Sequence, residues 1–260
     1  MILTRRKTLQ LGAGGLAAAG ATLIMPFSAM AQENAGDRYE SDNGEIAISP
    51  IAHASFVMTV PNMVIYVDPV GGAAAYDGHQ PADLILITHE HGDHFEPETL
   101  TALAGEQARL VTSPSVFEKL PEELKGRATA IRNGEKTTEG EIGIEAIPAY
   151  NTTEDRLQYH PKGRDNGYVV TVDGRRVYIA GDTEDIPEMR ALKDIDIAFV
   201  PMNLPYTMDV DQAASAVAEF APKVVYPYHY RGSDPEAFAS KVAEANGEIK
   251  VVQGPWYSEG

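Results

Sequence analysis

Residues 84–94 form the stretch Leu-Ile-Leu-Ile-Thr-His-Glu-His-Gly-Asp-His, in which three histidines and an aspartate follow an apolar run. Its first four residues form a short, continuously apolar run, which is typical of a strand buried on both faces. His89 and His91 follow the end of that strand two residues apart, so their side chains point to the same side. Asp93 and His94 fall where the chain turns toward a helix and are aimed differently. The spacing predicts ligands for two metal ions close together.

The alternative is a polar loop whose histidines are solvated or hydrogen bonded. Three of the seven histidines lie within these six positions, beside an aspartate and directly after a buried strand. A cluster with this ligand spacing favours a metal site.

Strands and helices alternate along the rest of the chain. The clearest local signal is Asp173-Gly174, a two-residue hairpin turn. Both halves contain strands followed by helices, which predicts an α/β fold, a four-layer αββα sandwich of two mixed β-sheets flanked by helices. The expected strands are 45–49, 55–60, 63–67, 84–87, 109–112, 128–131, 143–147, 168–172, 175–180, 195–200, 223–226 and 249–252, and the expected helices are 97–104, 115–120, 187–192, 210–220 and 235–245.

A chain of 260 residues can form one sizeable domain with a buried core. We expect residues 45–260 to be that domain. Residues 32–44 are polar and rich in Gly, Asn and Asp, so they are expected to be a flexible leader.

Residues 1–31 have the pattern of a twin-arginine (Tat-like) export signal peptide. Arg5-Arg6 lies in a cationic segment, Leu11 to Phe27 is apolar, and Ala29-Met30-Ala31 is a small-residue cleavage site. A transmembrane anchor is the alternative, but the glycine-rich apolar segment and the cleavage site favour export. The expected location is therefore periplasmic or secreted, with no stable membrane anchor after cleavage. The absence of cysteine suits an oxidising compartment.

The chain is strongly acidic, with a formal net charge of −17. Removing Arg5, Arg6 and Lys7 with the signal, which holds no acidic residue, takes −17 to −20. Such a charge repels polyanions, and the sequence has no basic stripe that would release counterions from a nucleic acid. These features argue against a nucleic-acid partner and for a small-molecule substrate, while the oligomeric state is left open.

Two more polar residues lie shortly after predicted strands. Asp182 lies in Gly181-Asp182-Thr183 after strand 175–180, and His229 follows the strand that begins at residue 223. Strand ends from different parts of a chain can converge on one edge, where a carboxylate can bridge two cations. Taken alone, Gly-Asp-Thr is also a common turn.

These motifs resemble those of the metallo-β-lactamase-fold hydrolase superfamily. More narrowly, they are similar to the group of ascorbate-phosphate lactonases and the N-acyl-phosphatidylethanolamine phospholipase D. The likeness covers residues 45–255, and the matching segments are 53–56, 88–94, 180–183 and 228–230. The resemblance implies one metal held by His89, His91 and a third histidine, a second held by Asp93, His94 and His229, and Asp182 between the two.

The third histidine departs from the commonest pattern. Many relatives carry it directly after the strand near residue 147, where this chain has Asn151. His160 lies nine residues later, between the two main motifs, and we assign it as the ligand; a loop histidine in a substrate lid is the alternative. His53 is expected to be a core histidine, a donor that orients a ligand, or itself a ligand. His79 is expected in a solvated loop.

Two divalent cations, two carboxylates and a bridging hydroxide leave a centre with a charge of about +1, which attracts anionic or polarised oxygens. We expect zinc, with manganese or iron as alternatives, because histidine and carboxylate ligands suit all three. A metal-bound hydroxide would attack a carbonyl or phosphoryl centre. Asp93 or Asp182 would pass a proton to the leaving group.

The predicted function is a binuclear metal-dependent hydrolase of a small-molecule lactone, ester or phosphodiester. The alternative is a non-catalytic metal-binding or sensing module of the same fold. Candidate substrate contacts lie on loops that follow the predicted ligands or strands, and an arginine or lysine among them would bind a phosphate or carboxylate. These candidates are Asn203, Tyr206, Tyr230, Arg231 and Lys162.

Overall fold

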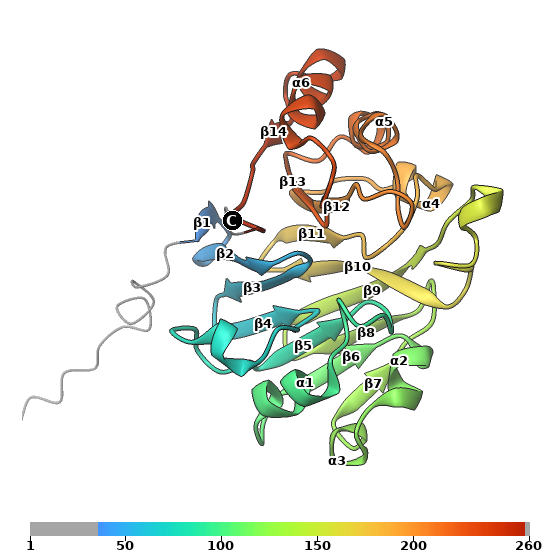
Figure 1. Ribbon diagram of the computed structural model, residues 1–260. Helices are drawn as coiled ribbons and strands as arrows, with labels where there is room; N and C mark the ends of the chain where they lie inside the picture. The colour runs from blue at the N-terminus through green and yellow to red at the C-terminus, as the bar shows by residue number, and fades with distance from the viewer. Residues whose placement is uncertain (1–35, 258–260) are drawn as a thin grey trace, which may run out of the picture. The chain divides into compact units, whose positions relative to one another are not determined.

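The structure is a computed structural model that describes residues 36–257 (Figure 1). Its strands form two seven-stranded mixed sheets, and in each sheet neighbouring strands are also neighbours along the chain. Residues 1–31, which carry the predicted export signal, lie outside the described residues. Within residues 36–257, no helix has the length and apolar character needed to cross a membrane.

The first sheet is antiparallel from β1 to β4 and parallel from β4 to β7. Its strands are β1 (Asp37–Glu40), β2 (Glu45–Ala52), β3 (Ser55–Val60), β4 (Met63–Val67), β5 (Leu84–Ile87), β6 (Arg109–Thr112) and β7 (Ala128–Ala130). The helical segments of this half are η2 (Ala73–Tyr76), α1 (Pro97–Ala104), α2 (Pro114–Lys119) and α3 (Glu122–Lys125).

The second sheet is antiparallel from β8 to β11 and parallel from β11 to β14. Its strands are β8 (Lys136–Glu139), β9 (Ile142–Ala149), β10 (Asp165–Val172), β11 (Arg175–Ile179), β12 (Ile197–Pro201), β13 (Val224–Tyr228) and β14 (Lys250–Val251). The helical segments of this half are η3 (Glu154–Arg156), α4 (Pro187–Arg190), α5 (Val210–Phe220) and α6 (Pro235–Ala245).

Three layers of buried apolar side chains hold the two sheets and their helices together. The central layer joins the two sheets, and Phe56 of β3 stacks there on Phe199 of β12 with ring centroids 4.1 Å apart. A second layer packs α4, α5 and α6 on the second sheet, and a third packs α1, α2 and α3 on the first. Figure 1 shows the two sheets between these two groups of helices. The predicted four-layer αββα sandwich is confirmed.

The predicted flexible leader, residues 32–44, is wrong in part, because residues 37–40 form strand β1. This strand pairs with β2 in the register Asp37 with Ile48, and its Asp37 carboxylate accepts a hydrogen bond from Tyr226 at 2.8 Å. Strand β8 was likewise missed. Both are polar strands at sheet edges, and edge strands carry few of the apolar residues that mark a buried strand.

The parallel strands bring their carboxyl ends to a common edge. Asp68 and Thr88 follow β4 and β5 in the first sheet, and Gly181 and His229 follow β11 and β13 in the second. Because the two sheets pack face to face, the segments after these strands meet at one side of the sandwich.

Candidate metal centre

The turn after β5 aims its four candidate ligands in two directions; they are His89, His91, Asp93 and His94. His94 and Phe95 each donate a backbone hydrogen bond to the carbonyl of His91, at 3.0 and 2.8 Å. This single helical turn moves Asp93 and His94 away from the direction that His91 takes from the strand end. The predicted difference in aim within the motif is therefore explained by local backbone hydrogen bonds.

Side chains from both sheets gather here in groups with the spacing of metal ligands. In each group, one candidate ligand atom per residue lies within 4.8 Å of the others. The groups are His89, His91 and His160; His53, Asp93, His94 and His229; and His89, His94 and Asp182. All seven residues proposed from the sequence as ligands are brought together, and His53 joins them.

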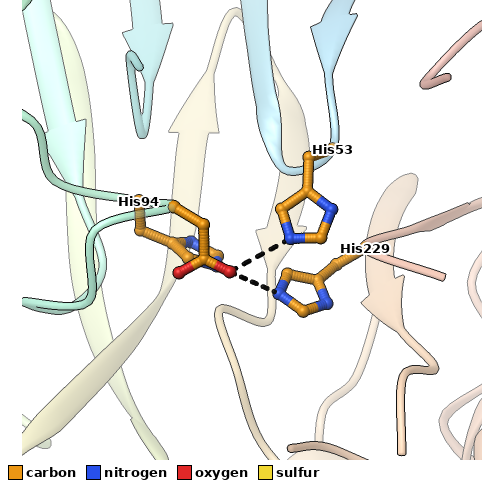
Figure 2. Close-up of side chains that lie close together, drawn as sticks. His53, His94 and His229 are labelled. Atoms are coloured by element: carbon orange, nitrogen blue, oxygen red, sulfur yellow. Dashed lines mark hydrogen bonds and ion pairs between the residues drawn. The ribbon is translucent and has the colours of Figure 1, made fainter. Parts of the chain in front are cut away.

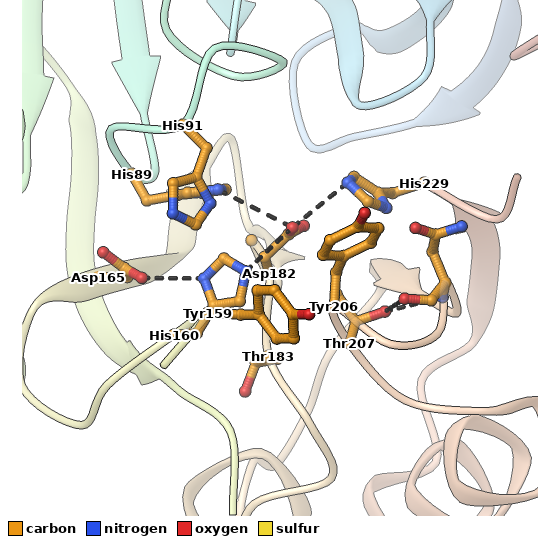
Figure 3. Close-up of polar contacts among 12 residues, drawn as sticks. His89, His91, Tyr159, His160, Asp165, Asp182, Thr183, Tyr206, Thr207 and His229 are labelled. Carbon is orange, nitrogen blue, oxygen red and sulfur yellow. Dashed lines mark hydrogen bonds and ion pairs between the residues drawn. The ribbon is translucent and has the colours of Figure 1, made fainter. Parts of the chain in front are cut away.

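Asp182 lies at the centre of the cluster, with its side chain almost fully buried. Its Oδ2 lies 3.3 Å from Nε2 of His229 and 3.4 Å from Nε2 of His160 (Figure 3). Its Oδ1 lies 3.3 Å from Nε2 of His94, and Nε2 of His89 is 3.9 Å from Oδ2. One carboxylate thus faces both histidine groups, which is the placement that a bridging ligand requires.

The unpaired polar atoms at this point fit a metal. Buried polar atoms in folded proteins are nearly always hydrogen bonded. Here six buried atoms of Asp182 and the histidines around it have no hydrogen-bond partner. They are Nε2 of His89, His94, His160 and His229, Nδ1 of His229, and Oδ1 of Asp182. Imidazole nitrogens and a carboxylate oxygen that converge in this way form a donor set for divalent cations.

Buried aspartates orient the imidazole rings from behind. Asp68 accepts from Nδ1 of His94 at 2.8 Å and from the hydroxyl of Thr88 at 2.7 Å. That hydroxyl lies 3.0 Å from Nδ1 of His89, and Asp165 lies 3.0 Å from Nδ1 of His160. Holding Nδ1 leaves Nε2 of each ring to face the centre.

Sequence reasoning missed Asp68 and Asp165. Asp68 carried a usable signal, because it directly follows the apolar strand β4 just as His229 directly follows β13. Asp165 begins β10 instead of following a strand, so the same pattern could not find it.

His53 has contacts on both sides of its ring. Its Nε2 lies 3.1 Å from Oδ2 of Asp93, and the same oxygen lies 3.4 Å from Nε2 of His229 (Figure 2). Its Nδ1 lies 2.7 Å from the hydroxyl of Tyr257, and burial lowers its pKa. Both ring nitrogens are engaged, so we interpret His53 as a residue that orients Asp93.

Burial and neighbouring charges shift the pKa values of the ionisable side chains in the cluster. Burial alone would raise the pKa of Asp182, but His229 and His94 hold it well below its usual range. Burial opposes the charged form of His94, yet Asp182 and Asp68 raise its pKa well above the usual value. For His89, burial and the neighbouring His94 lower the pKa well below the usual value. A bound cation would take the place of the protons that neutralise the carboxylates.

A cavity of about 690 Å³ opens onto the cluster. Three of the predicted substrate contacts line it, namely Asn203, Tyr206 and Arg231, together with Asp93 and Tyr159. The side chain of Asn203 is already engaged, because its Nδ2 donates to the carbonyl of Arg231.

Lys162 and Tyr230 do not line this cavity. Lys162 donates to the hydroxyl of Tyr150 at 3.0 Å and pairs with Glu188 at 3.4 Å, so its charge is directed to another part of the surface. Tyr230 lines a second cavity of about 440 Å³, which shares His53 and Arg231 with the first. Closeness to a ligand in sequence therefore does not place either side chain in this cavity, because side-chain direction is set by local contacts.

Comparison with known proteins agrees with this fold and cluster. Residues 47–229 match the family model of the beta-lactamase superfamily domain. A UPF0173 metal-dependent hydrolase from Pyrococcus furiosus is 32% identical over 222 residues, which span 80% of this chain and 95% of the relative. A second, from Thermococcus onnurineus, is 32% identical and spans 75% of this chain and 91% of the relative.

Solved structures give the same result. A crystal structure described as a metal-dependent hydrolase from Parabacteroides distasonis has a TM-score of 0.76 and 43% identity, covering 85% of this chain and 99% of that chain. Igni18, a metallo hydrolase from Ignicoccus hospitalis, has a TM-score of 0.66 and 27% identity, covering 80% and 94%. Taken with the converging histidines and Asp182, these matches show that the chain belongs to the beta-lactamase superfamily and is a metal-dependent hydrolase.

Proposed function

We propose that the protein is a binuclear hydrolase that cleaves a lactone, an ester or a phosphodiester in a small-molecule substrate. The observation that carries this proposal is the single buried carboxylate of Asp182 between two groups of unpaired imidazole nitrogens. One metal would be held by His89, His91 and His160, and the second by Asp93, His94 and His229. Zinc is the expected metal, with manganese or iron as alternatives.

Bound divalent cations supply Lewis acidity and lower the pKa of water toward neutrality. The protein's contribution is to hold the substrate and to move a proton. The carboxylate of Asp93 is suited to the proton transfer, because its side chain is 50% exposed and lines the cavity. Its Oδ2 is engaged by His53 and His229, which leaves Oδ1 to take a proton and release it to the leaving group. Asp182 is buried, so its role is to bridge.

The open cavity favours this function over a non-catalytic metal-binding or sensing module. Its volume of about 690 Å³ falls in the range of small-molecule sites. Because the half-exposed Asp93 shares the cavity with Tyr206 and Arg231, a substrate can reach both the metal ligands and groups that would bind it.

Metal analysis combined with turnover tests the proposal. Elemental analysis of the purified protein would be run beside His160→Ala and beside His79→Ala, since His79 belongs to none of the ligand groups found in residues 36–257. Two metals per chain, a fall toward one in His160→Ala only, and metal-dependent cleavage of bis(4-nitrophenyl) phosphate or a lactone panel are expected. One metal or none, with no turnover, would overturn it.

We also propose export to the periplasm or cell exterior through the twin-arginine route. The supporting features are Arg5-Arg6, the apolar segment from Leu11 to Phe27 and the Ala29-Met30-Ala31 site. Cell fractionation tests the proposal. Replacing Arg5 and Arg6 by lysine should retain the protein inside the cell, and unchanged export would contradict it.

A further inference from the structure

Within residues 36–257, Arg231 is the cationic side chain that lines the cavity beside the metal cluster. No other lysine or arginine of that region lines the cavity, and none of the ion pairs there includes Arg231. By contrast, Lys162 and Arg164, which follow His160, pair with Glu188 and Asp165. In a protein of formal charge −17, an arginine without a carboxylate partner beside the metal ligands is a local exception.

The backbone of Arg231 is held from two sides. Its N–H donates to the hydroxyl of Tyr257 at 3.1 Å, and its carbonyl accepts from Nδ2 of Asn203. Its guanidinium lies over the Tyr257 ring, 5.5 Å from the centroid. The Tyr257 hydroxyl also contacts His53, which contacts Asp93, so Arg231 is linked to the metal cluster. These contacts fix the arginine's position and leave its fork of N–H donors for a ligand.

Aromatic and apolar side chains gather elsewhere along the cavity. Tyr159 and Tyr206 both line it, and their rings meet edge to face with centroids 5.1 Å apart (Figure 3). Among the described residues, the large hydrophobic side chains that are exposed all lie on the loops of these two tyrosines; they are Leu157, Leu204 and Tyr206. The loops that carry the two tyrosines of the cavity thus also expose apolar side chains.

We infer that the substrate is an acid, with a carboxylate or phosphate oxyanion bound by Arg231 and an apolar or aromatic group packed against Tyr159 and Tyr206. This inference rests on the proposed hydrolysis and names the substrate class for that same site. The guanidinium fork matches the geometry of an oxyanion, and the net negative charge of the protein disfavours anions elsewhere on it. The scissile bond then lies between the two contacts, over Asp93 and Asp182.

Matched esters test this recognition. The free-acid substrate is the mono-4-nitrophenyl ester of adipic acid, and its methyl-capped counterpart is the neutral control. The 4-nitrophenyl ester of 4-phosphonobutanoic acid distinguishes a phosphate-like anion from a carboxylate. The metal-loaded proteins are the wild type, Arg231→Gln, Arg231→Lys and a control, Arg38→Gln. Arg38 lies on the edge strand β1 and pairs with Glu45 of β2.

The wild type is expected to prefer a free-acid ester over the capped ester by about tenfold or more in kcat/KM. Arg231→Gln should abolish that preference through a rise of about 10- to 100-fold in KM for the acid alone. Arg231→Lys should keep part of it, because lysine retains the charge but lacks the fork. Arg38→Gln should match the wild type. No preference in the wild type, or an equal loss on acid and capped esters, would overturn the inference.

Calorimetric binding of adipate monomethyl ester and 4-phosphonobutanoate gives a readout that does not depend on turnover. Elemental analysis of each variant would establish that its metal content is unchanged. Weaker binding to Arg231→Gln without any ester cleavage in the wild type would support anion recognition and overturn the proposed hydrolysis. Cleavage of capped esters, with equal binding of the acids to the wild type and to Arg231→Gln, would support the proposed hydrolysis and overturn anion recognition.

Discussion

The amide N–H of Asn151 donates a hydrogen bond of 2.8 Å to the carbonyl of His160, nine residues further along the chain. The loop between them therefore closes on itself and returns His160 to the end of β9. The side chain of Asn151 donates to the carbonyls of Arg156, inside the loop, and Tyr206, on the neighbouring loop. The contacts of Asn151 thus bring a histidine to the strand end that lacks one.

Glu184 is expected to control the position of His160. Its buried carboxylate accepts from the amides of Thr152 and Thr153 at 2.7 and 2.8 Å and pairs with Arg156 at 2.8 Å. Glu184→Ala should cost about 3 kcal/mol of unfolding free energy, since it leaves a charge unpaired. It should also lower the metal content toward one per chain. Denaturant unfolding and elemental analysis measure the two effects.

The matched control for that variant is Glu188→Gln, because Glu188 pairs with the exposed Lys162. A surface pair contributes less than about 1 kcal/mol, so its stability and metal content should stay close to those of the wild type. Two retained metals and wild-type stability in Glu184→Ala would show that the loop holds His160 without Glu184.

Asp68→Asn should weaken metal binding without changing which residues bind it. The substitution keeps the size of the side chain but removes the anion that accepts from Nδ1 of His94. Loss of such an orienting carboxylate typically costs about 10- to 100-fold in affinity. Competition with a coloured chelator measures the change. Asp83→Asn is the control, since Asp83 accepts from the amide of Val64 at the other end of these strands. Equal affinities in the two variants would refute the role of Asp68.

The stability of the metal-free protein and the gain in stability from bound metal should depend differently on pH. The lowered pKa of Asp182 gives stability that is present above its usual value of 3.8 and is lost as the pH falls through the depressed value. The raised pKa of His94 gives stability that is present below 6.5 and is lost as the pH rises through the elevated value. The stability that Asp182 and His94 give to the metal-free protein should therefore be complete between pH 3.8 and pH 6.5 and decline at alkaline pH.

Metal binding has the opposite dependence, because the metal needs neutral imidazoles. The rise in Tm that metal gives over chelator-treated protein should be larger at about pH 9 than at about pH 6. Thermal unfolding across that range checks this. A metal-dependent rise that shrinks with increasing pH would show that these protons do not compete with metal.

His53→Gln should retain both metals but lower kcat. The ring of His53 lies between the Tyr257 hydroxyl and Oδ2 of Asp93, so its removal disturbs Asp93 more than the rest of the cluster. We expect a loss of about tenfold or more in kcat with little change in KM. Tyr257→Phe should show a smaller effect of the same kind. Loss of one metal in His53→Gln would instead identify His53 as a ligand.

The sequence predicted β5, which leads into the histidine motif, because this strand is buried and continuously apolar. β3, β4, β5 and β6 have the predicted bounds, and helices α1, α5 and α6 do as well. The polar edge strands β1 and β8 could not be recognised by the same criterion. Their positions depend on pairing with a neighbour instead of on their own composition.

The residues of the candidate site likewise divide into those that the sequence could locate and those that it could not. Residues that follow apolar strands, such as His89 and Asp182, were found because strand ends have fixed directions. His160 was reached from the spacing of the motifs, and its loop path could not be foreseen because it depends on Glu184 and Asn151. Lys162 does not line the cavity, since its direction is set by contacts with Tyr150 and Glu188 that no periodicity encodes.

Strand order that follows chain order has a consequence for biogenesis. Residues up to β7 build one sheet and residues from β8 onward build the other, so each half can organise from local pairings as it leaves the ribosome. The first half carries His89, His91, Asp93 and His94, whereas His160, Asp182 and His229 come from the second. The candidate ligands of both halves thus come together only after the halves dock, so we expect tight cation capture to be a late event in maturation.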